Sequence, residues 1–195
     1  ALVYTTTNSV NRDYWDHPGN DNTLTPLFCD PDYPDNPDSM DKLVNIDATE
    51  PGNPGNPDNW GNDYSQRLWG DIIAPETGTY YFCAAGDDEH EFWLNDGTTA
   101  GVNSWEACGG LVQITCYAGW TNHQQWTKHA GQKSGPVCLT AGEAYYFEGY
   151  HHENGGGDSF TIGWRKPSDG NGCAPVGAIP TCNVSSRLAW YWDND

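Results

Sequence analysis

The 195-residue chain has the length of one domain, and single all-β domains often reach this size. It carries 27 acidic against 8 basic residues, a formal net charge of −19, and a heavy aromatic load of 10 Trp, 11 Tyr and 5 Phe. A surface this acidic repels phosphate groups, which argues against nucleic acid and anionic membranes as partners and favours cations. A well-solvated acidic surface is the simpler explanation for much of this charge.

Seven cysteines lie scattered at positions 29, 83, 108, 116, 138, 173 and 182, and none forms a CxxC pair. This spacing argues against a zinc ribbon or a thioredoxin-type site and favours an oxidising compartment. Cys173 with Cys182 and Cys108 with Cys116 are plausible bridges, although other pairings stay open. No apolar run of about 20 residues is visible, so we expect no membrane insertion. No signal peptide is visible either, and we therefore interpret the chain as a mature or trimmed secreted domain of a larger extracellular protein.

The first part of the chain is rich in proline. The phrases PDYPDNPD at residues 31–38 and PGNPGNPD at residues 51–58 resemble each other, but no third copy follows, as a solenoid repeat would require. We expect long ordered loops with polyproline character here. Residues 1–59 are predicted to supply N-terminal strands and loops, residues 60–167 the core of a single domain spanning 1–195, and residues 168–195 an extension that packs back on it.

Strand signals are clear from Tyr64 onward, and helical periodicity is almost absent. Turn signals at residues 75–78 and 95–97 separate short runs rich in β-branched and aromatic residues. Phe160, Ile162 and Trp164 share one face by the period-2 rule. Strands are therefore predicted over residues 66–73, 79–85, 91–94, 111–115, 137–139, 144–148 and 159–164. Many short strands at regular spacing indicate an all-β antiparallel sandwich or barrel.

An acidic segment, GDDEHE at residues 86–91, follows one of these strands. Neighbouring side chains on an extended strand point to opposite faces, so Asp87 and Asp88 can reach one ion only if the backbone between them is bent, for example by a cis peptide. A hard cation with several oxygen ligands could compensate for that conformation. A solvated acidic loop that ends a strand is the alternative interpretation.

A second acidic segment, HHENGGGD, spans residues 151–158. Its glycines permit positive φ and convergent carbonyls, which calcium sites use beside carboxylates and amides. A flexible hairpin loop is the alternative. Histidine is a poor ligand for a hard cation, so His151 and His152 fit sugar contact or loop packing better, and a zinc site lacks a partner cluster.

A third segment, AGWTNHQQW at residues 118–126, combines aromatic rings with amide and imidazole groups. Sugars present apolar ring faces with polar rims, so such a segment suits carbohydrate binding. The candidate contacts are Trp120, His123 and Gln125. The alternative is that the tryptophans anchor the loop or fill the core.

Ordered pieces of the chain resemble the protective-antigen-type domain family, known as PA-fourteen. They are RLWG at residues 67–70, PETGTYYF at 75–82, GDD at 86–88, EFWL at 91–94, GWT at 119–121, LTAG at 139–142 and GGGD at 155–158. The resemblance implies a two-sheet antiparallel β-sandwich with long Pro/Gly-rich loops.

In the sugar-binding branch of that family, with its bacterial adhesins and yeast flocculins, an Asp-Asp pair joined by a cis peptide holds Ca²⁺. That pair matches Asp87 and Asp88. The branch completes the ion shell from a later loop, where the flocculin ligand Asn is replaced here by His152. Asn154, Gly156 and Asp158 are therefore the predicted further metal ligands, and His152 joins the predicted carbohydrate contacts with Asp87 and Asp88.

These features predict a calcium-dependent lectin or adhesin module without catalytic activity, whose ion coordinates vicinal hydroxyls of a terminal sugar. A calcium-binding structural or protein-interaction module is one alternative. Glycoside hydrolysis is another, and it requires two carboxylates that face each other across a cleft at ~5–10 Å.

Overall fold

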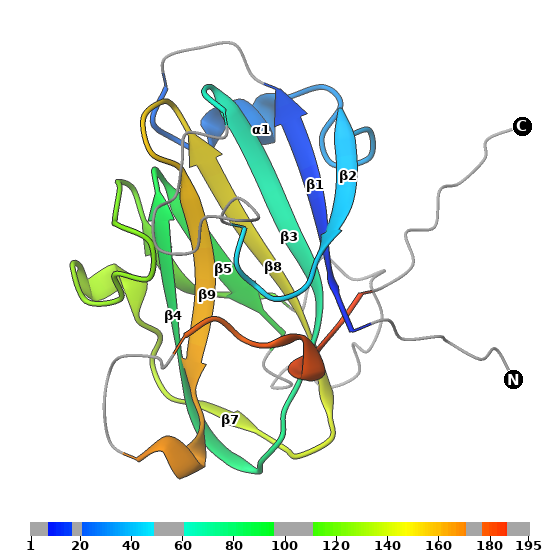
Figure 1. The fold of residues 1–195 in the computed structure, drawn as a ribbon, viewed down its shortest axis with the longest axis vertical. Coiled ribbons are helices and arrows are strands. Elements are labelled where there is room, and N and C mark those ends of the chain that lie inside the picture. Colours follow the sequence, from blue (N-terminus) through cyan, green and yellow to red (C-terminus); the bar gives the residue numbers. More distant parts are fainter. Residues whose placement is uncertain (1–7, 17–20, 49–60, 96–110, 171–176, 187–195) are drawn as a thin grey trace, which may run out of the picture.

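A computed structural model describes residues 8–16, 21–48, 61–95, 111–170 and 177–186. Strands dominate it, and they form one seven-stranded and one three-stranded sheet that pack face to face (Figure 1). All strand pairs named in the two sheets are antiparallel. The predicted all-β sandwich is therefore confirmed.

The large sheet has the strand order β2-β1-β3-β8-β5-β6, and β10 pairs with β3 beside this path. Its strands are β1 (Val10–Asp16), β2 (Ser39–Leu43), β3 (Tyr64–Ile73), β5 (His90–Leu94), β6 (Val112–Tyr117), β8 (Ala144–Glu153) and β10 (Val184–Ser185). The small sheet has the order β7-β4-β9, with β4 (Gly78–Asp87), β7 (Val137–Leu139) and β9 (Ser159–Arg165). Short helices are α1 (Thr25–Cys29) and three 3-10 turns, Ala130–Gln132, Pro167–Asp169 and Thr181–Asn183.

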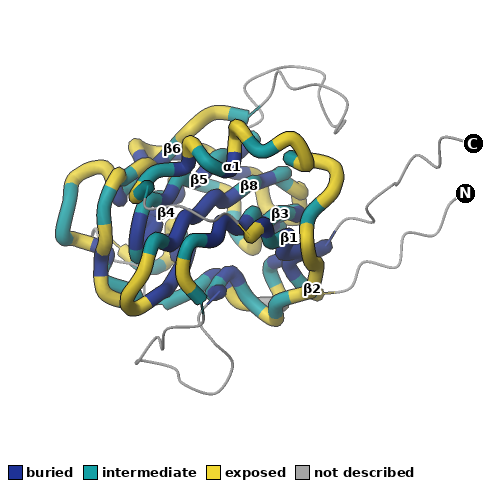
Figure 2. Tube along the Cα trace, turned by 90° about the horizontal axis from the view of Figure 1, so that it is seen from above, coloured by how far each residue is buried: buried dark blue, intermediate teal, exposed yellow. Residues whose placement is uncertain are grey.

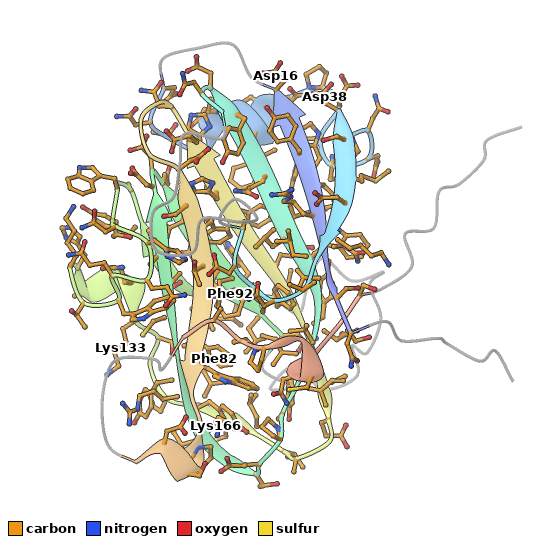
Figure 3. The ribbon with its side chains drawn as sticks, in the orientation of Figure 1. Asp16, Asp38, Phe82, Phe92, Lys133 and Lys166 are labelled. Carbon is orange, nitrogen blue, oxygen red and sulfur yellow. The ribbon has the colours of Figure 1, made fainter. Side chains whose placement is uncertain are left out.

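The core lies between the two sheets, where buried residues concentrate (Figure 2). Phe82 on β4 and Phe92 on β5 meet across it with ring centroids 5.5 Å apart, and both lie in the interior in Figure 3. Phe160, Ile162 and Trp164 all belong to this core, as the period-2 pattern predicts.

Two predicted boundaries need correction. Strand β8 continues five residues beyond the predicted end at 148, so the two histidines and Glu153, which were placed in a glycine-rich loop, belong to a strand. Residues 31–35 form turns rather than an extended polyproline segment. The segment 51–58 lies outside the described residues.

The cysteines found in the described residues form no disulfide with one another. Cys108 and Cys173 lie outside these residues, so both suggested bridges stay predictions. In the part of the chain that the structure describes, no helix has the length and apolar character needed to cross a membrane.

Gly149 on β8 gives a direct test of core packing. A Cβ at this position would lie 2.9 Å from Ile162 Cδ1 and 3.0 Å from Phe160 Cε1. We expect Gly149→Ala to lower the free energy of unfolding by about 1–3 kcal/mol, since overpacking forces the neighbouring side chains to move. Gly135→Ala is the matched control, because no atom lies within 4 Å of its Cβ position. Urea unfolding of both variants checks this, and equal midpoints would contradict it.

Candidate functional site

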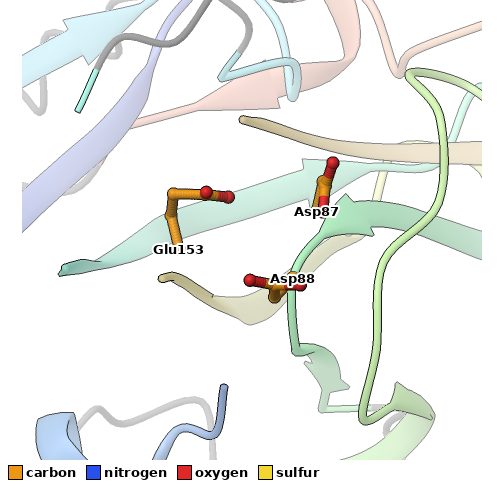
Figure 4. Close-up of side chains that lie close together, drawn as sticks. All are labelled: Asp87, Asp88 and Glu153. Carbon is orange, nitrogen blue, oxygen red and sulfur yellow. The ribbon is translucent and has the colours of Figure 1, made fainter. Parts of the chain in front are cut away.

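Three carboxyl groups converge at one end of the sandwich (Figure 4). Asp87 ends β4, Asp88 follows it, and Glu153 ends β8. One oxygen from each lies within 4.8 Å of the others, which makes this a group able to hold a metal ion. We call Asp87, Asp88 and Glu153 the carboxylate cluster. The peptide bond between Asp87 and Asp88 is cis, the conformation anticipated from their adjacency.

Strand register explains why Glu153 belongs to this cluster. On β8, Phe147 points into the core, and residues 149, 151 and 153 follow it on the same face. Glu153 therefore faces the small sheet, where β4 ends. It was not among the predicted ligands, because the strand was predicted to stop at residue 148.

The buried oxygens of this region have few hydrogen-bond donors. Neither carboxylate oxygen of Glu153 has a hydrogen-bond partner of good geometry. The side-chain oxygen of Asn154 is also buried without a partner. Buried polar atoms are normally hydrogen-bonded, so a concentration of acceptors without donors fits a cation.

Electrostatics lead to the same conclusion. Burial, followed by the charge of Asp88, raises the pKa of Asp87 to about 7. Burial, followed by the charges of Asp88 and Asp87, raises the pKa of Glu153 to about 9. Asp158 also raises both pKa values. Negative charge in this cluster is therefore costly without a cation, and the residues present fit a hard divalent ion.

The other predicted metal ligands all lie in the segment that follows Glu153. The backbone N–H of Asn154 donates to Asp88 Oδ2 at 3.3 Å. Asp158 is buried, and its Oδ2 accepts from Gly61 N and Tyr64 Oη at 3.0 and 3.2 Å. Gly156 lies in an exposed loop with a φ of +119°. Coordination by Asn154, Gly156 and Asp158 stays a prediction.

His152 points away from the cluster. Its side chain is 1% exposed, and its Nδ1 lies 2.9 Å from Ser65 Oγ on the neighbouring strand β3. Adjacent strand residues face opposite sides, so Glu153 and His152 cannot both face the site. This position does not support the predicted sugar contact by His152, nor a zinc site using both histidines.

Trp120 lies on a loop that is fastened beside the cluster. The backbone N–H of Thr121 donates to Gly86 O at 2.7 Å, and Gly86 N–H donates to Thr121 Oγ1 at 3.0 Å. This attachment places Trp120 near the end of β4, with 51% of the residue exposed. Lys128 Nζ lies 3.0 Å from the centre of its ring and donates to Trp120 O at 2.8 Å.

The other two predicted sugar contacts have partners within the protein. His123 Nε2 lies 2.8 Å from Asp47 Oδ2. Gln125 Oε1 accepts from the backbone N–H of Asn122 at 3.1 Å. These bonds fix the conformation of the loop. Of the three predicted contacts, Trp120 is the one with an exposed side chain.

Comparisons with known proteins identify the family and the fold. The sequence model of the PA14 domain matches residues 30–176. The N-acetyl-beta-glucosaminyl-glycoprotein 4-beta-N-acetylgalactosaminyltransferase 1 of Mus musculus is 35% identical over 109 residues, which cover 54% of this chain and 10% of the mouse protein. The chain thus spans about a tenth of the length of this curated relative.

Solved structures share the fold at low sequence identity. The PA14 domain of the MpAFP antifreeze protein has a TM-score of 0.60 at 15% identity, covering 95% of this chain and 94% of its own. The PA14 sugar-binding domain from an RTX adhesin has a TM-score of 0.59 at 15% identity, covering 92% and 98%. The Epithelial Adhesin 9 A domain from Candida glabrata, in complex with Galβ1-4GlcNAc, has a TM-score of 0.57 at 15% identity, covering 88% and 87%.

An anti-sigma factor domain-containing protein has a TM-score of 0.58 at 17% identity, and the chain covers only half of its length. These structural similarities show the fold alone. The family is shown by the PA14 sequence model, which matches most of the chain. The resemblance noted in the sequence is thereby confirmed: the chain belongs to the PA14 domain family.

Proposed function

We propose that the chain is a calcium-dependent carbohydrate-binding module of an extracellular protein. The observation that carries this proposal is the carboxylate cluster, in which both oxygens of Glu153 lack a hydrogen-bond donor and in which burial and neighbouring charges suppress the ionisation of Asp87 and Glu153. Asp87, Asp88 and Glu153 would hold the ion, with Asn154 beside them. A bound Ca²⁺ supplies exchangeable coordination positions that suit two neighbouring hydroxyl groups.

Support for a sugar ligand comes from what surrounds the cluster. The exposed indole of Trp120 provides an apolar face for a sugar ring. The RTX adhesin domain is described as sugar-binding, and the Candida glabrata domain was crystallised with a disaccharide. A single-site contact of this kind binds weakly, and several modules together would give strength.

A binding role fits the geometry better than glycoside hydrolysis. Oxygens of the cluster lie within 4.8 Å of one another, closer than the roughly 5–9.5 Å that separates paired glycosidase carboxylates. The mouse relative is a transferase of which the chain spans a tenth, so its activity is not carried over to this module. A calcium-binding module that recognises a protein remains the second candidate, favoured by the same cluster.

Glu153→Gln tests whether the cluster binds an ion. We expect the dissociation constant for Ca²⁺ to rise by at least about tenfold, because a charged ligand is replaced by a neutral one. Glu143→Gln, on an exposed turn residue, is the matched control and should bind like the wild-type chain. Isothermal titration calorimetry gives both constants. Equal affinities of the two variants would remove Glu153 from the site.

The pH dependence of stability gives a second test. Unfolded carboxyl groups ionise near pH 4, whereas those of Asp87 and Glu153 ionise near 7 and 9 in the ion-free fold. The folded state therefore holds extra protons between these values, and its stability falls as pH rises through this window. We expect the melting temperature in EDTA to drop between about pH 7 and 9, where histidine side chains are neutral in both states, and Ca²⁺ to remove most of that drop.

Two buried histidines set the lower limit of this pH range. Burial lowers the pKa of His90 to about 4 and that of His151 to about 3, whereas histidines in the unfolded chain take up protons below about pH 6.5. They therefore make stability rise with pH up to about 7 and leave the slope above that value to the carboxyl groups. If the melting temperature depended on pH in the same way with and without Ca²⁺, the assignment of the ion site to these carboxyl groups would be contradicted.

A glycan array separates the sugar from the ion. We expect EDTA and Asp88→Ala to abolish binding, because both remove the ion. Trp120→Ala should weaken sugar binding while the Ca²⁺ affinity measured by calorimetry stays within about twofold, since the indole contacts sugar and not the ion. If Asp88→Ala still bound its glycans, the cluster would not be the sugar site. A chain that binds Ca²⁺ but no glycan would favour the protein-interaction alternative.

A further inference from the structure

We infer that His90 and His151 are positioning residues of the carboxylate cluster, each donating one hydrogen bond to a backbone carbonyl of the aspartate pair. His151 donates from its Nε2 to Asp87 O, and His90 donates from its Nδ1 to Asp88 O. This inference rests on the proposed ion site. It assigns these two side chains a defined task, setting the geometry of the ligands without touching the ion.

The tautomer of His151 follows from its two partners. Its Nδ1 lies 2.9 Å from Gln66 Nε2, and an amide nitrogen can only donate a hydrogen bond. Nδ1 therefore accepts, and the ring proton resides on Nε2. That nitrogen lies 2.6 Å from Asp87 O, an acceptor, so Gln66 and His151 form a directed chain of donors that ends on the aspartate backbone.

His90 reaches the second carbonyl from strand β5. Its Nδ1 lies 3.0 Å from Asp88 O, and because a carbonyl only accepts, the ring proton resides on this nitrogen. Gly86 provides the space for the ring, since a Cβ there would lie 2.7 Å from His90 Nδ1 and 2.9 Å from its Cγ. A glycine directly before the aspartate pair is thus required by the imidazole.

Both rings are held in place by packing against the same phenyl group. The His151 ring stacks on Phe160 with centroids 5.4 Å apart and planes 9° apart, and the His90 ring lies 6.2 Å from Phe160. Both histidines are fully buried. Burial keeps them neutral above pH 5, so each retains one donor and a fixed tautomer over the physiological range.

The two bonds matter because they fix the backbone that carries two ligands of the cluster. His151 lies two residues before Glu153 on β8, so the bond to Asp87 O connects the strand of the third carboxylate with the end of β4. The backbone N–H of Asp88 also donates to His152 O at 3.1 Å. Partners that orient ligands in this way typically contribute about 10–100-fold to metal affinity.

Pairs of variants on the full chain test the inference. His151→Phe keeps a flat ring against Phe160 but removes the donor, whereas His151→Gln keeps an N–H near the position of Nε2. His90→Phe and His90→Asn form the corresponding pair for Nδ1. We expect the Phe variants to raise the Ca²⁺ dissociation constant by about 10–100-fold and the amide variants to stay within about threefold of wild type.

A control distinguishes positioning from general stability. Ser134→Ala removes a buried hydroxyl that accepts from Phe82 N–H at 2.9 Å, five residues before the aspartate pair. It should lower the melting temperature in EDTA without changing the Ca²⁺ affinity. Gln66→Leu leaves both histidines in place, so it tests the inference even if the Phe variants fail to fold. It should raise the Ca²⁺ dissociation constant above that of Ser134→Ala.

The outcomes separate this inference from the proposed function. Wild-type protein that gives no calorimetric signal with Ca²⁺ overturns both. Wild-type protein that binds, with Phe and amide variants of equal affinity, overturns the positioning role alone. Gln66→Leu with wild-type affinity overturns the donor chain through His151.

Discussion

The repulsion among two buried carboxyl groups and one half-buried carboxyl group is the constraint around which this end of the molecule is organised. Asp87 and Glu153 end strands of different sheets, Asp88 follows Asp87, and few hydrogen-bond donors are available where the three meet. Such a group is stable only if its members keep their protons or share a cation. The raised pKa values of Asp87 and Glu153 describe the first solution, and the proposed Ca²⁺ site describes the second.

The backbone around the cluster shows the opposite character, because its polar groups are paired. The N–H of Asp88, the carbonyl groups of the pair and the backbone of Asn154 all have partners. Unsatisfied side-chain atoms on a satisfied backbone are typical of functional sites, where local rules are broken for a ligand. The hydrogen bonds thus fix the backbone and leave both oxygens of Glu153 without a donor.

The N-terminal segment supports the same strands from the outer face of the large sheet. Asp13 on β1 accepts from Arg67 Nη2 at 2.6 Å and from Trp69 Nε1 at 2.8 Å, both on β3. Glu89, the residue after the aspartate pair, accepts from Leu24 N–H at 2.6 Å, directly before α1. The described segments 8–16 and 21–48 are therefore part of the structure that supports these strands.

The proposed ion site and the proposed sugar contact lie on different kinds of structure. Asp87 and Glu153 lie at strand ends, where Asp87 pairs with Ser159 on β9 and Glu153 pairs with Tyr64 on β3. Trp120 lies on a surface loop attached through Thr121 to Gly86, and the hydrogen bond between His123 and Asp47 holds another part of this loop. Loops tolerate change better than strands, so under the proposed function the sugar contact could vary while the ion site is retained.

The sequence alone was enough to predict the sandwich, most strand positions and the Asp87-Asp88 pair, because alternation and a recognisable order of motifs are local properties. It missed Glu153 and misplaced His152, although Phe147, Gly149, His151 and Glu153 follow the period of one strand face. The glycines after residue 154 indicated a loop, and pairing of β8 with β3 and β5 extended the strand to their edge. Only the tertiary structure decided which oxygens converge, since a carboxylate from β8 meets the end of β4 through the packing of two sheets, which no local pattern encodes.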